Sequence, residues 1–255
     1  MSRILITGST DGLGLAAARE LITNGHEVVL HARSSERTKA IGQLAAKSLG
    51  VVVGDLSNGA ETRSMADQLN TIGRMDAVIH NAGIYSEPAR GDTPEGHPKV
   101  LAVNTLVPYI LTALIERPKR LVYLSSGMHQ SGGREIEDID WRRRPWNTGR
   151  AYSESKLHVA ALAAAVARYW PEVLSNAVDP GWVPTKMGGA GAPDNLREGY
   201  QTQVWLATSD DEKARSSGGY WYHREQRKPA DEVTDPDYQD ELIRKLETLT
   251  DVKLF

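Results

Sequence analysis

Short apolar runs alternate with longer amphipathic segments along most of this 255-residue chain. The runs have the length of buried strands, and the segments between them carry apolar residues at helical spacing. The predicted strands are Ile4–Ile6, His26–Ala32, Leu49–Val53, Met75–His80, Arg120–Ser125, Leu174–Val178 and Gly218–His223. The first predicted helix starts at Leu15 and ends before Asn24. The other predicted helices are Ser34–Lys47, Gly59–Ile72, Glu95–Glu116, Ala151–Trp170, Asn195–Ser209 and Asp237–Thr248. This alternation predicts an α/β fold with a doubly wound, seven-stranded parallel sheet and helices on both faces.

Two stretches fall outside the alternation. Residues 127–150 are polar and rich in glycine, arginine and aspartate, and residues 184–195 contain a cluster of glycines. The second stretch suits a mobile loop that closes on a substrate, and a disordered loop without a role is the alternative. No repeat or low-complexity linker divides the chain, so residues 1–255 are predicted to form one domain.

The first strand turns into the first helix through three glycines, Gly8, Gly12 and Gly14. Glycines allow a tight turn and the close approach of a ligand, and the N–H groups at the start of a helix attract negative charge. The spacing differs from the usual dinucleotide fingerprint, and Leu13 stands where a phosphate-binding P-loop needs lysine. The turn indicates a site for the pyrophosphate of a dinucleotide, and a turn that serves only packing is the alternative.

Composition narrows the class of protein further. The net charge is -3, and the densest basic run, Arg142–Arg144, fits a solvated loop, so no nucleic-acid partner is expected. The chain has no cysteine, which excludes disulfides and thiolate metal ligands, and no metal is expected. The longest apolar run, Val159–Ala167, is too short to span a membrane. A soluble, cytoplasmic protein that binds a small molecule is the expectation.

The end of the second strand is the place where a dinucleotide's adenosine ribose is read. An NAD site has an acid about 20 residues past the glycines. Here Arg33 and Ser34 stand at that point instead. Arg33 can pair with a 2′-phosphate and Ser34 can donate a further hydrogen bond, which predicts a preference for NADP(H) over NAD(H). A surface arginine beside the loop is the alternative.

Two further strand ends carry polar or small residues. Asp55, followed by Leu56, ends the third strand, and Asn81-Ala82-Gly83 ends the fourth. Asp55 can accept a hydrogen bond from an adenine amino group, although aspartate is common at loop starts. The small residues allow a ribose to approach, and Asn81 can equally be a turn residue that holds the loop together.

Tyr152 and Lys156 stand four positions apart in a predicted helix, so their side chains share one face. A phenol is a poor acid or base at neutral pH, but a neighbouring ammonium lowers its pKa. The pair can then protonate a carbonyl oxygen or deprotonate an alcohol during hydride transfer. Such pairs occur often on exposed helices, so the weight of this one comes from the strand–helix units that precede it.

With these residues assembled, the chain resembles the short-chain dehydrogenase/reductase family, which has a Rossmann-type fold. The resemblance runs from Arg3 to about Thr185 and continues more weakly to Tyr222. The matching motifs are Thr7-Gly8 through Gly12-Leu13-Gly14, then Asp55, Asn81-Ala82-Gly83, Asn104, Ser125-Ser126, Tyr152-x-x-x-Lys156 and Pro180-Gly181-x-x-x-Thr185.

The resemblance implies a role for each matching position. Tyr152 would be the general acid/base, Lys156 would lower its pKa and hold the nicotinamide ribose, and Ser126 would orient the substrate oxygen, with Ser125 a weaker candidate. Asn104 would hold a water that relays protons toward Lys156, with a buried helix asparagine as the alternative. The residues implied to contact the cofactor are Gly8, Ser9, Thr10, Asp11, Gly12, Leu13, Gly14, Arg33, Ser34, Asp55, Leu56, Asn81, Ala82, Gly83, Tyr152, Lys156, Pro180, Gly181, Val183 and Thr185.

One departure concerns residues 127–150. They make the gap between Ser126 and Tyr152 roughly twice that of the family's simplest members, and a similar insertion occurs in the branch that resembles retinol dehydrogenases and carbonyl reductases. The insertion suits a flap beside the substrate. The alanine-rich face Val159–Ala167 suits a homodimer or homotetramer contact, and burial of that face within one chain is the alternative.

A histidine and several large apolar side chains bear on the nature of the substrate. His129 either touches it or is a loop histidine without a role. The aromatic and methionine side chains near the site suit apolar pocket walls, and core packing is their alternative; they are Trp141, Trp146, Trp182 and Met187. The sequence thus predicts an NADP(H)-dependent oxidoreductase acting on a carbonyl/alcohol pair of a small hydrophobic compound. A non-catalytic protein that senses NADP(H) is the alternative, and an epimerase or dehydratase with tightly held cofactor is a third.

Overall fold

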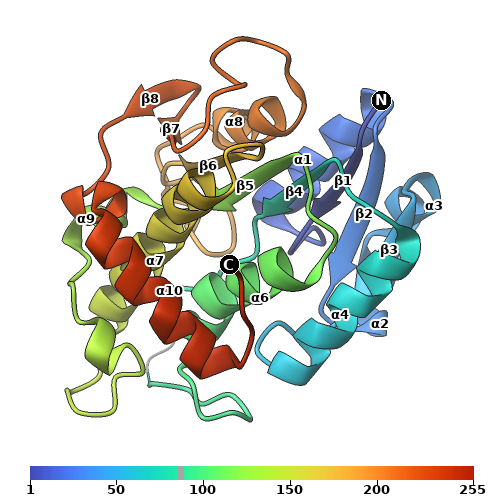
Figure 1. Cartoon of the computed structure of the whole chain (residues 1–255). Coiled ribbons are helices and arrows are strands. Elements are labelled where there is room, and N and C mark those ends of the chain that lie inside the picture. The colour runs from blue at the N-terminus through green and yellow to red at the C-terminus, as the bar shows by residue number, and fades with distance from the viewer. Residues whose placement is uncertain (86–88) are drawn as a thin grey trace.

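A computed structural model describes residues 1–85 and 89–255. Within them an eight-stranded sheet has the order β3-β2-β1-β4-β5-β6-β7-β8 (Figure 1). The strands are β1 (Arg3–Ile6), β2 (Glu27–Ala32), β3 (Gly50–Val53), β4 (Ala77–His80), β5 (Arg120–Leu124), β6 (Leu174–Asp179), β7 (Tyr220–Tyr222) and β8 (Glu225–Arg227). The first seven pair in parallel, which confirms the predicted sheet. The antiparallel β8 was not predicted, because its three residues are polar and exposed and give no apolar signal.

The helices follow the predicted order with several differences. They are α1 (Gly12–Thr23), α2 (Ser35–Ala40), α3 (Gly42–Lys47), α4 (Gly59–Ile72), α5 (Lys99–Leu101), the π-helix η1 (Ala102–Leu106), α6 (Val107–Leu114), the 3-10 helices η2 (Gly127–Ser131) and η3 (Ile136–Asp138), α7 (Thr148–Tyr169), α8 (Leu196–Thr208), α9 (Asp231–Thr234) and α10 (Pro236–Thr250). The predicted helix over 34–47 is two helices, because Gly42 has a φ of 42° and breaks it. The predicted helix over 95–116 begins only at Lys99.

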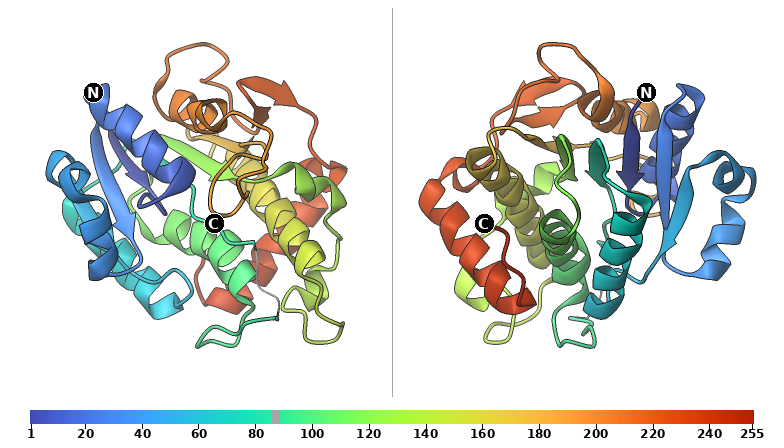
Figure 2. Two further views of the ribbon diagram at one scale, coloured as in Figure 1. Left: turned by 180° about the vertical axis from the view of Figure 1, so that it is seen from behind. Right: turned by 45° about the vertical axis from the view of Figure 1, so that its right-hand side comes forward.

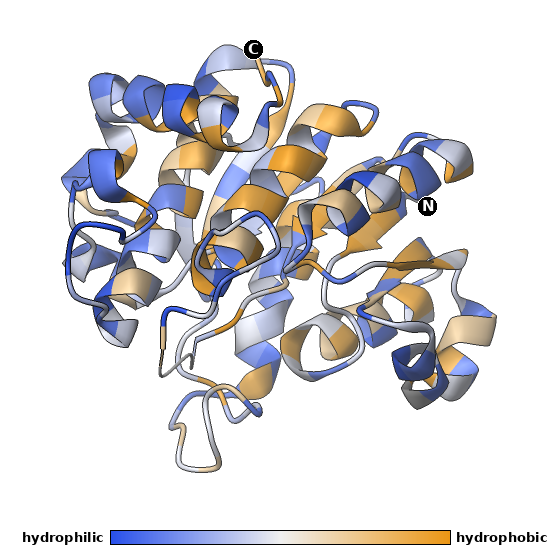
Figure 3. Ribbon diagram, turned by 90° about the horizontal axis from the view of Figure 1, so that it is seen from below, coloured by the Kyte–Doolittle hydropathy of each residue, from blue (hydrophilic) through white to orange (hydrophobic). Residues whose placement is uncertain are grey.

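Two hydrophobic layers hold the helices against the sheet. Leu5 of β1 and Val78 of β4 belong to the cluster shared with α4, α6 and α7, while Ile4 and Ile6 belong to the cluster shared with α1 and α8. The ribbon views show helices on both sides of the sheet (Figure 2). This alternation follows from the two-residue period of a strand. The hydrophobic segments accordingly gather in the strands and in the helix turns that face them (Figure 3).

The last helix adds a further layer. α10 runs along α7, which is visible in Figure 1. The buried side chains of Leu242 and Leu246 join the same hydrophobic cluster as Ala160 and Ala163 of α7. The alanine-rich face is therefore buried within the chain, the second of the two alternatives for it. That face is not free to form a dimer or tetramer contact.

The topology fixes where a ligand site can lie. Seven strands run in one direction, so their carboxyl ends share one edge of the sheet. The order reverses between β1 and β4, and in doubly wound sheets ligands bind at the carboxyl edge beside such a switch point. No helix in the described part of the chain is both long and apolar enough to cross a membrane.

Candidate active site

The glycine turn between β1 and α1 leaves no room for side chains. Gly8 and Gly12 have φ values of 65° and 52°, a region that favours glycine. A Cβ on Gly14 would lie 2.5 Å from the Gly8 carbonyl oxygen and in hard contact with the Asn81 amide. That amide donates to the carbonyl oxygens of Thr7 at 2.9 Å and Gly8 at 3.3 Å. Asn81 thus ties the turn to the end of β4, as the sequence allowed.

A buried histidine links the turn to the two neighbouring strands. His31 Nδ1 accepts from the Gly8 N–H at 2.9 Å, and its Nε2 lies 2.9 Å from the Gly54 carbonyl oxygen. These two partners require the neutral ring with its proton on Nε2, and burial lowers the pKa of His31 accordingly. The Ser9 hydroxyl accepts from the His31 N–H at 2.8 Å and is fully buried. The Ser9 side chain therefore ties the glycine turn to β2.

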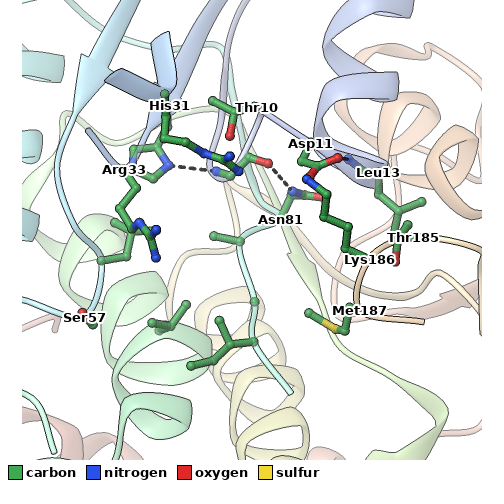
Figure 4. Close-up of a pocket in the computed structure, with 18 of the residues that line it drawn as sticks. Thr10, Asp11, Leu13, His31, Arg33, Ser57, Asn81, Thr185, Lys186 and Met187 are labelled. Atoms are coloured by element: carbon green, nitrogen blue, oxygen red, sulfur yellow. Dashed lines mark hydrogen bonds and ion pairs between the residues drawn. The ribbon is translucent and has the colours of Figure 1, made fainter. Parts of the chain in front are cut away.

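A cavity of about 490 Å³ opens at this edge of the sheet (Figure 4). Among its lining residues, those expected from the sequence are Gly8, Thr10, Asp11, Gly12, Leu13, Arg33, Asp55, Leu56, Asn81, Ala82, Gly83 and Thr185. Met187 was expected as an apolar wall of the substrate pocket, and those not expected are His31, Arg37, Ser57, Ile84, Lys99, Val103 and Lys186. The expected cofactor contacts that are not among its lining residues are Ser9, Gly14, Ser34, Tyr152, Lys156, Pro180, Gly181 and Val183.

One end of the cavity carries two guanidinium groups. Arg33 follows β2, and Arg37 lies one turn into α2; both are exposed and line the cavity. Figure 4 shows the Arg33 side chain at the opposite end from Met187. Ser34 caps α2, and its Oγ accepts a weak 3.4 Å hydrogen bond from the Arg37 N–H. Arg37 could have been found from the sequence as the cation one helical turn beyond Arg33.

Aspartate side chains hold two loops of the cavity. Asp55 Oδ1 accepts from the N–H and the hydroxyl of Ser57 at 2.9 and 2.8 Å. Asp11 caps α1 by accepting from the Gly12 N–H at 2.8 Å. Asp11 also pairs with Lys186, which reaches back from the loop after β6 (Figure 4). That hydrogen bond lowers the pKa of Asp11. The pair brings residues 184–195 to the mouth of the glycine turn.

Beyond the glycine-lined cavity, Tyr152 and Lys156 lie on the same face of α7. The Lys156 ammonium is 5.6 Å from the centre of the Tyr152 ring and donates to the Leu124 carbonyl oxygen at 2.8 Å. Burial raises the pKa of Tyr152 to about 12, against a hydrogen bond with Ser126 that lowers it. Burial lowers the pKa of Lys156 to about 8. The sequence predicted a lowered phenol pKa, but here desolvation of the phenolate dominates.

Asn104 lies within the π-helix η1, a distortion that is frequent at functional sites. Its amide donates to the Ile84 carbonyl oxygen at 3.0 Å and to Ser155 Oγ at 2.9 Å, and its Oδ1 accepts from the Ile84 N–H at 2.9 Å. A Cβ on Gly83 would lie 3.4 Å from this Oδ1 and 3.3 Å from Lys156 Nζ. The bare Gly83 therefore keeps open a small space that Asn104 and Lys156 both face.

His129 is buried and has structural partners. Its Nδ1 lies 2.8 Å from the Ser126 carbonyl oxygen, and its Nε2 accepts from the Ala230 N–H at 3.0 Å. It thus connects the turn after β5 to the segment before α9. Neither of the two alternatives considered for this histidine includes that role. It holds the backbone of Ser126 in place.

The insertion is anchored to α7 by an ion pair that the sequence did not suggest. Arg144 forms two hydrogen bonds with the Glu154 carboxylate at 2.8 and 2.6 Å, and the two side chains are only 17% and 3% exposed. Its guanidinium also lies 3.7 Å from the centre of the Trp141 ring. The solvated loop predicted for the basic run is therefore wrong for Arg144, because charge pairing holds it inside.

Aromatic side chains surround Tyr152. Tyr85 meets it edge to face with ring centres 4.7 Å apart, and Trp141 and Trp146 pack in the same small cluster. Trp182 and Met187 are by contrast exposed on the loop after β6, and the Trp182 Nε1 donates to the Gly188 carbonyl oxygen. Apolar walls thus stand beside a phenol, a hydroxyl and an ammonium. Such a set can bind a small apolar carbonyl compound and deliver a proton to its oxygen.

Comparison with known proteins places this geometry in a family. The family model for short chain dehydrogenases matches residues 2–195. A short-chain dehydrogenase of Penicillium rubens, chyC, is 42% identical over 258 residues, covering 100% of this chain and 99% of that protein. DnrU of a Streptomyces strain, named as a daunorubicin C-13 ketoreductase, is 31% identical over 241 residues, 87% of this chain and 83% of that protein. Human retinol dehydrogenase 13 is 29% identical over 199 residues, 72% of this chain and 60% of that protein.

Solved structures of other proteins have a similar fold. The crystal structure of an uncharacterized protein from Mycobacterium paratuberculosis has a TM-score of 0.87 at 25% identity and covers 100% of this chain and 95% of its own. A blue fluorescent protein from a metagenomic library, in complex with NADPH, shares the fold with a TM-score of 0.70 at 18% identity, over 87% of this chain and 95% of its own. With the family model and chyC, these matches show that the chain belongs to the short-chain dehydrogenase/reductase family, in its retinol dehydrogenase-like branch, and is a nicotinamide-dependent oxidoreductase acting on CH–OH and C=O groups.

Proposed function

We propose that this protein transfers a hydride between NADP(H) and a carbonyl or secondary alcohol of a small, largely hydrophobic substrate. One observation carries the proposal: two arginines, the glycine turn and Gly83 line one cavity, and Gly83 lies beside Lys156. A dinucleotide lying along it would place its 2′-phosphate at the arginines and its nicotinamide toward Tyr152. Asp55 would accept from the adenine amino group.

The residues present fit such a cofactor. The glycine turn offers the N–H groups of a helix start to a pyrophosphate, and the bare Gly83 leaves space that a Cβ would fill. Thr185 lies against the turn, where a Cβ on Gly12 would be 3.3 Å from its methyl group. Pro180, Gly181 and Val183 precede it on the loop after β6 and would back the nicotinamide.

The protein's own side chains would bind the substrate and transfer the proton. A bound reduced nicotinamide supplies the hydride for the carbonyl carbon. Tyr152 donates its proton to the substrate oxygen, and Ser126 holds that oxygen by a hydrogen bond. Lys156 would hold the nicotinamide ribose and would stabilise the phenolate once the proton has left. Asn104 holds the water through which Lys156 exchanges protons with solvent. Residues 184–195 close over the substrate and exclude bulk water.

The preference for NADP(H) rests on Arg33 and Arg37. Hydrogen bonds to a charged group contribute about 1.5–3 kcal/mol each, so the pair should favour NADPH over NADH by at least about tenfold to hundredfold. Titration of tryptophan fluorescence with each cofactor measures this ratio. Replacing both arginines by alanine should reduce it to near one. Lys39→Ala is the control, because Lys39 is an exposed cation of the same helix that does not line the cavity.

A sensor of NADP(H) without turnover is the alternative that the sequence left open, and the family assignment argues against it. Both candidates require tight NADPH binding, and only the enzyme consumes NADPH when a carbonyl compound is added. The intact set of Ser126, Tyr152, Lys156 and Asn104 favours the enzyme, because a sensor has no need of it. Equal affinity for NADPH and NADH in the wild type would refute the role given to the arginines.

A further inference from the structure

A carboxylate that no catalytic step uses stands beside the reacting groups. Asp179 is the last residue of β6, next to the end of β5 in the sheet. The Ser125 N–H donates to the Val178 carbonyl oxygen at 2.7 Å, which holds the two strand ends together. Asp179 therefore lies alongside the segment that carries Ser126.

The two oxygens of this carboxylate have different surroundings. Oδ1 accepts from the Gly181 N–H at 2.9 Å and so shapes the turn after β6. Oδ2 points the other way, and a Cβ on Gly127 would lie only 3.1 Å from it. Gly127 directly follows Ser126, whose hydroxyl bonds to Tyr152. Oδ2 thus lies beside the residue that follows Ser126.

Among residues 1–85 and 89–255, the one hydrogen bond to the Asp179 carboxylate comes from the Gly181 N–H to Oδ1, and no donor or cation there pairs with Oδ2. The side chain is partly buried, yet its charge reaches the site, because it raises the pKa of both Tyr152 and Lys156. A carboxylate oxygen in such a place is left without a partner when an apolar substrate displaces the water around it, and this is costly. A substrate that brings its own donor avoids the cost.

We propose that Asp179 selects carbonyl compounds that carry a hydrogen-bond donor, a hydroxyl or a protonated amine, on the carbon next to the reacting carbonyl. The donor would bond to Oδ2 while the carbonyl oxygen lies between Ser126 and Tyr152. This inference rests on the proposed function and names the class of substrate for that site. The rest of the substrate lies against Tyr85 and the tryptophans and is apolar.

Two compounds of nearly equal size test it. 2-Hydroxyacetophenone has a hydroxyl where propiophenone has a methyl group. A hydrogen bond to a charged acceptor should give the hydroxy ketone about a tenfold to hundredfold higher kcat/KM, with NADPH as the reductant. 2-Aminoacetophenone, assayed at a pH where its amine is protonated, should be preferred to propiophenone in the same way.

The deciding variant is Asp179→Asn. It keeps the Oδ1 acceptor for Gly181 and turns the other oxygen into an amide nitrogen, a donor. The ratio of the two kcat/KM values should fall at least about tenfold relative to wild type. The different intrinsic reactivity of the two ketones cancels because the same ratio is compared between wild type and variant. Asp210→Asn is the matched control. The Asp210 side chain is 97% exposed, lies 3.5 Å from Arg120, and is not among the charges that act on Tyr152.

The outcomes separate this inference from the proposed function. Wild type that reduces both ketones equally well, or Asp179→Asn that keeps the wild-type ratio, would overturn the role of Asp179 and leave the oxidoreductase intact. Wild type that oxidises NADPH with neither ketone nor a broader carbonyl panel would overturn both. If Asp179→Asn does not fold, Asp179→Ser still offers an oxygen to Gly181 and should lower the ratio as well.

Discussion

Replacing Gly14 by alanine should distort the glycine turn that lines the cofactor cavity. The new Cβ would lie 2.5 Å from the Gly8 carbonyl oxygen and 3.1 Å from Asn81 Cγ, and would press on the amide between them. The Gly8 oxygen is backbone in a tight turn and cannot swing aside. Relief therefore requires α1 to shift away from the turn and Asn81 to leave its hydrogen bonds with the Thr7 and Gly8 carbonyl oxygens.

The size of the effect follows from three contributions. Forcing an extra methyl into a packed site costs about 1–3 kcal/mol. Losing the hydrogen bonds of a buried amide costs a further ~1–3 kcal/mol. Alanine in a helix returns about 1 kcal/mol relative to glycine. The free energy of unfolding should therefore fall by roughly 1–5 kcal/mol, since the first two losses outweigh the gain.

Urea denaturation measures this directly. With a denaturant dependence of about 3 kcal/mol per molar urea, the midpoint should fall by roughly 0.3–1.7 M. The affinity for NADPH should fall as well, because Asn81 holds the glycine turn in shape. Gly149→Ala is the control, since Gly149 lies in the first turn of α7 and the nearest atom to its Cβ would be 3.7 Å away. Gly14→Ala that matches the wild type in both midpoint and NADPH affinity would refute the reasoning.

Two further predictions concern stability: the effect of low pH on two buried histidines, and the effect of removing Arg144 from its ion pair with Glu154. His80 and His158 are fully buried, and burial lowers the pKa of each to about 3. Between that value and the unfolded pKa of about 6.5, the unfolded state binds more protons than the folded state. The free energy of unfolding therefore falls as the pH falls through this range. Each should cost roughly 2 kcal/mol at pH 5 relative to pH 7, so the urea midpoint should drop, and His158→Leu should make the drop smaller; an equal drop in that variant would contradict the assignment. Arg144→Ala should destabilise the protein by up to about 3–5 kcal/mol, because it leaves the buried Glu154 carboxylate with only Arg150, 3.8 Å away, as an ion-pair partner. Adding Glu154→Gln should restore part of that loss in urea denaturation, and a double variant no more stable than the single one would speak against the pair.

The sequence predicted the sheet well, because buried parallel strands give continuous apolar runs. It also located the glycine turn and the pairing of Tyr152 with Lys156, because in each the chemistry lies within one short stretch of chain. What it missed depends on contacts between distant segments. Lys186 comes near Asp11 only through the fold, and the burial of Arg144 depends on α7.

Other misses follow from the same limit. The pKa of Tyr152 could not be inferred from its neighbour alone, because desolvation by the surrounding chain sets its direction. The spacing of Val159–Ala167 shows an apolar face but not what covers it, and here α10 does. Ser9 stands at a position that matches the family motif, and its hydroxyl accepts a hydrogen bond from the β2 backbone, which the sequence does not show.

The most direct test of the central claim compares wild type with Tyr152→Phe in the oxidation of NADPH by 2-hydroxyacetophenone. General acid catalysis is worth about 10²–10⁴ in rate, so the variant should lose at least a hundredfold in kcat. Its Kd for NADPH should stay within about twofold, because the phenylalanine keeps the ring against Tyr85. A variant that oxidises NADPH at the wild-type rate would contradict the role of Tyr152 and with it the proposed mechanism.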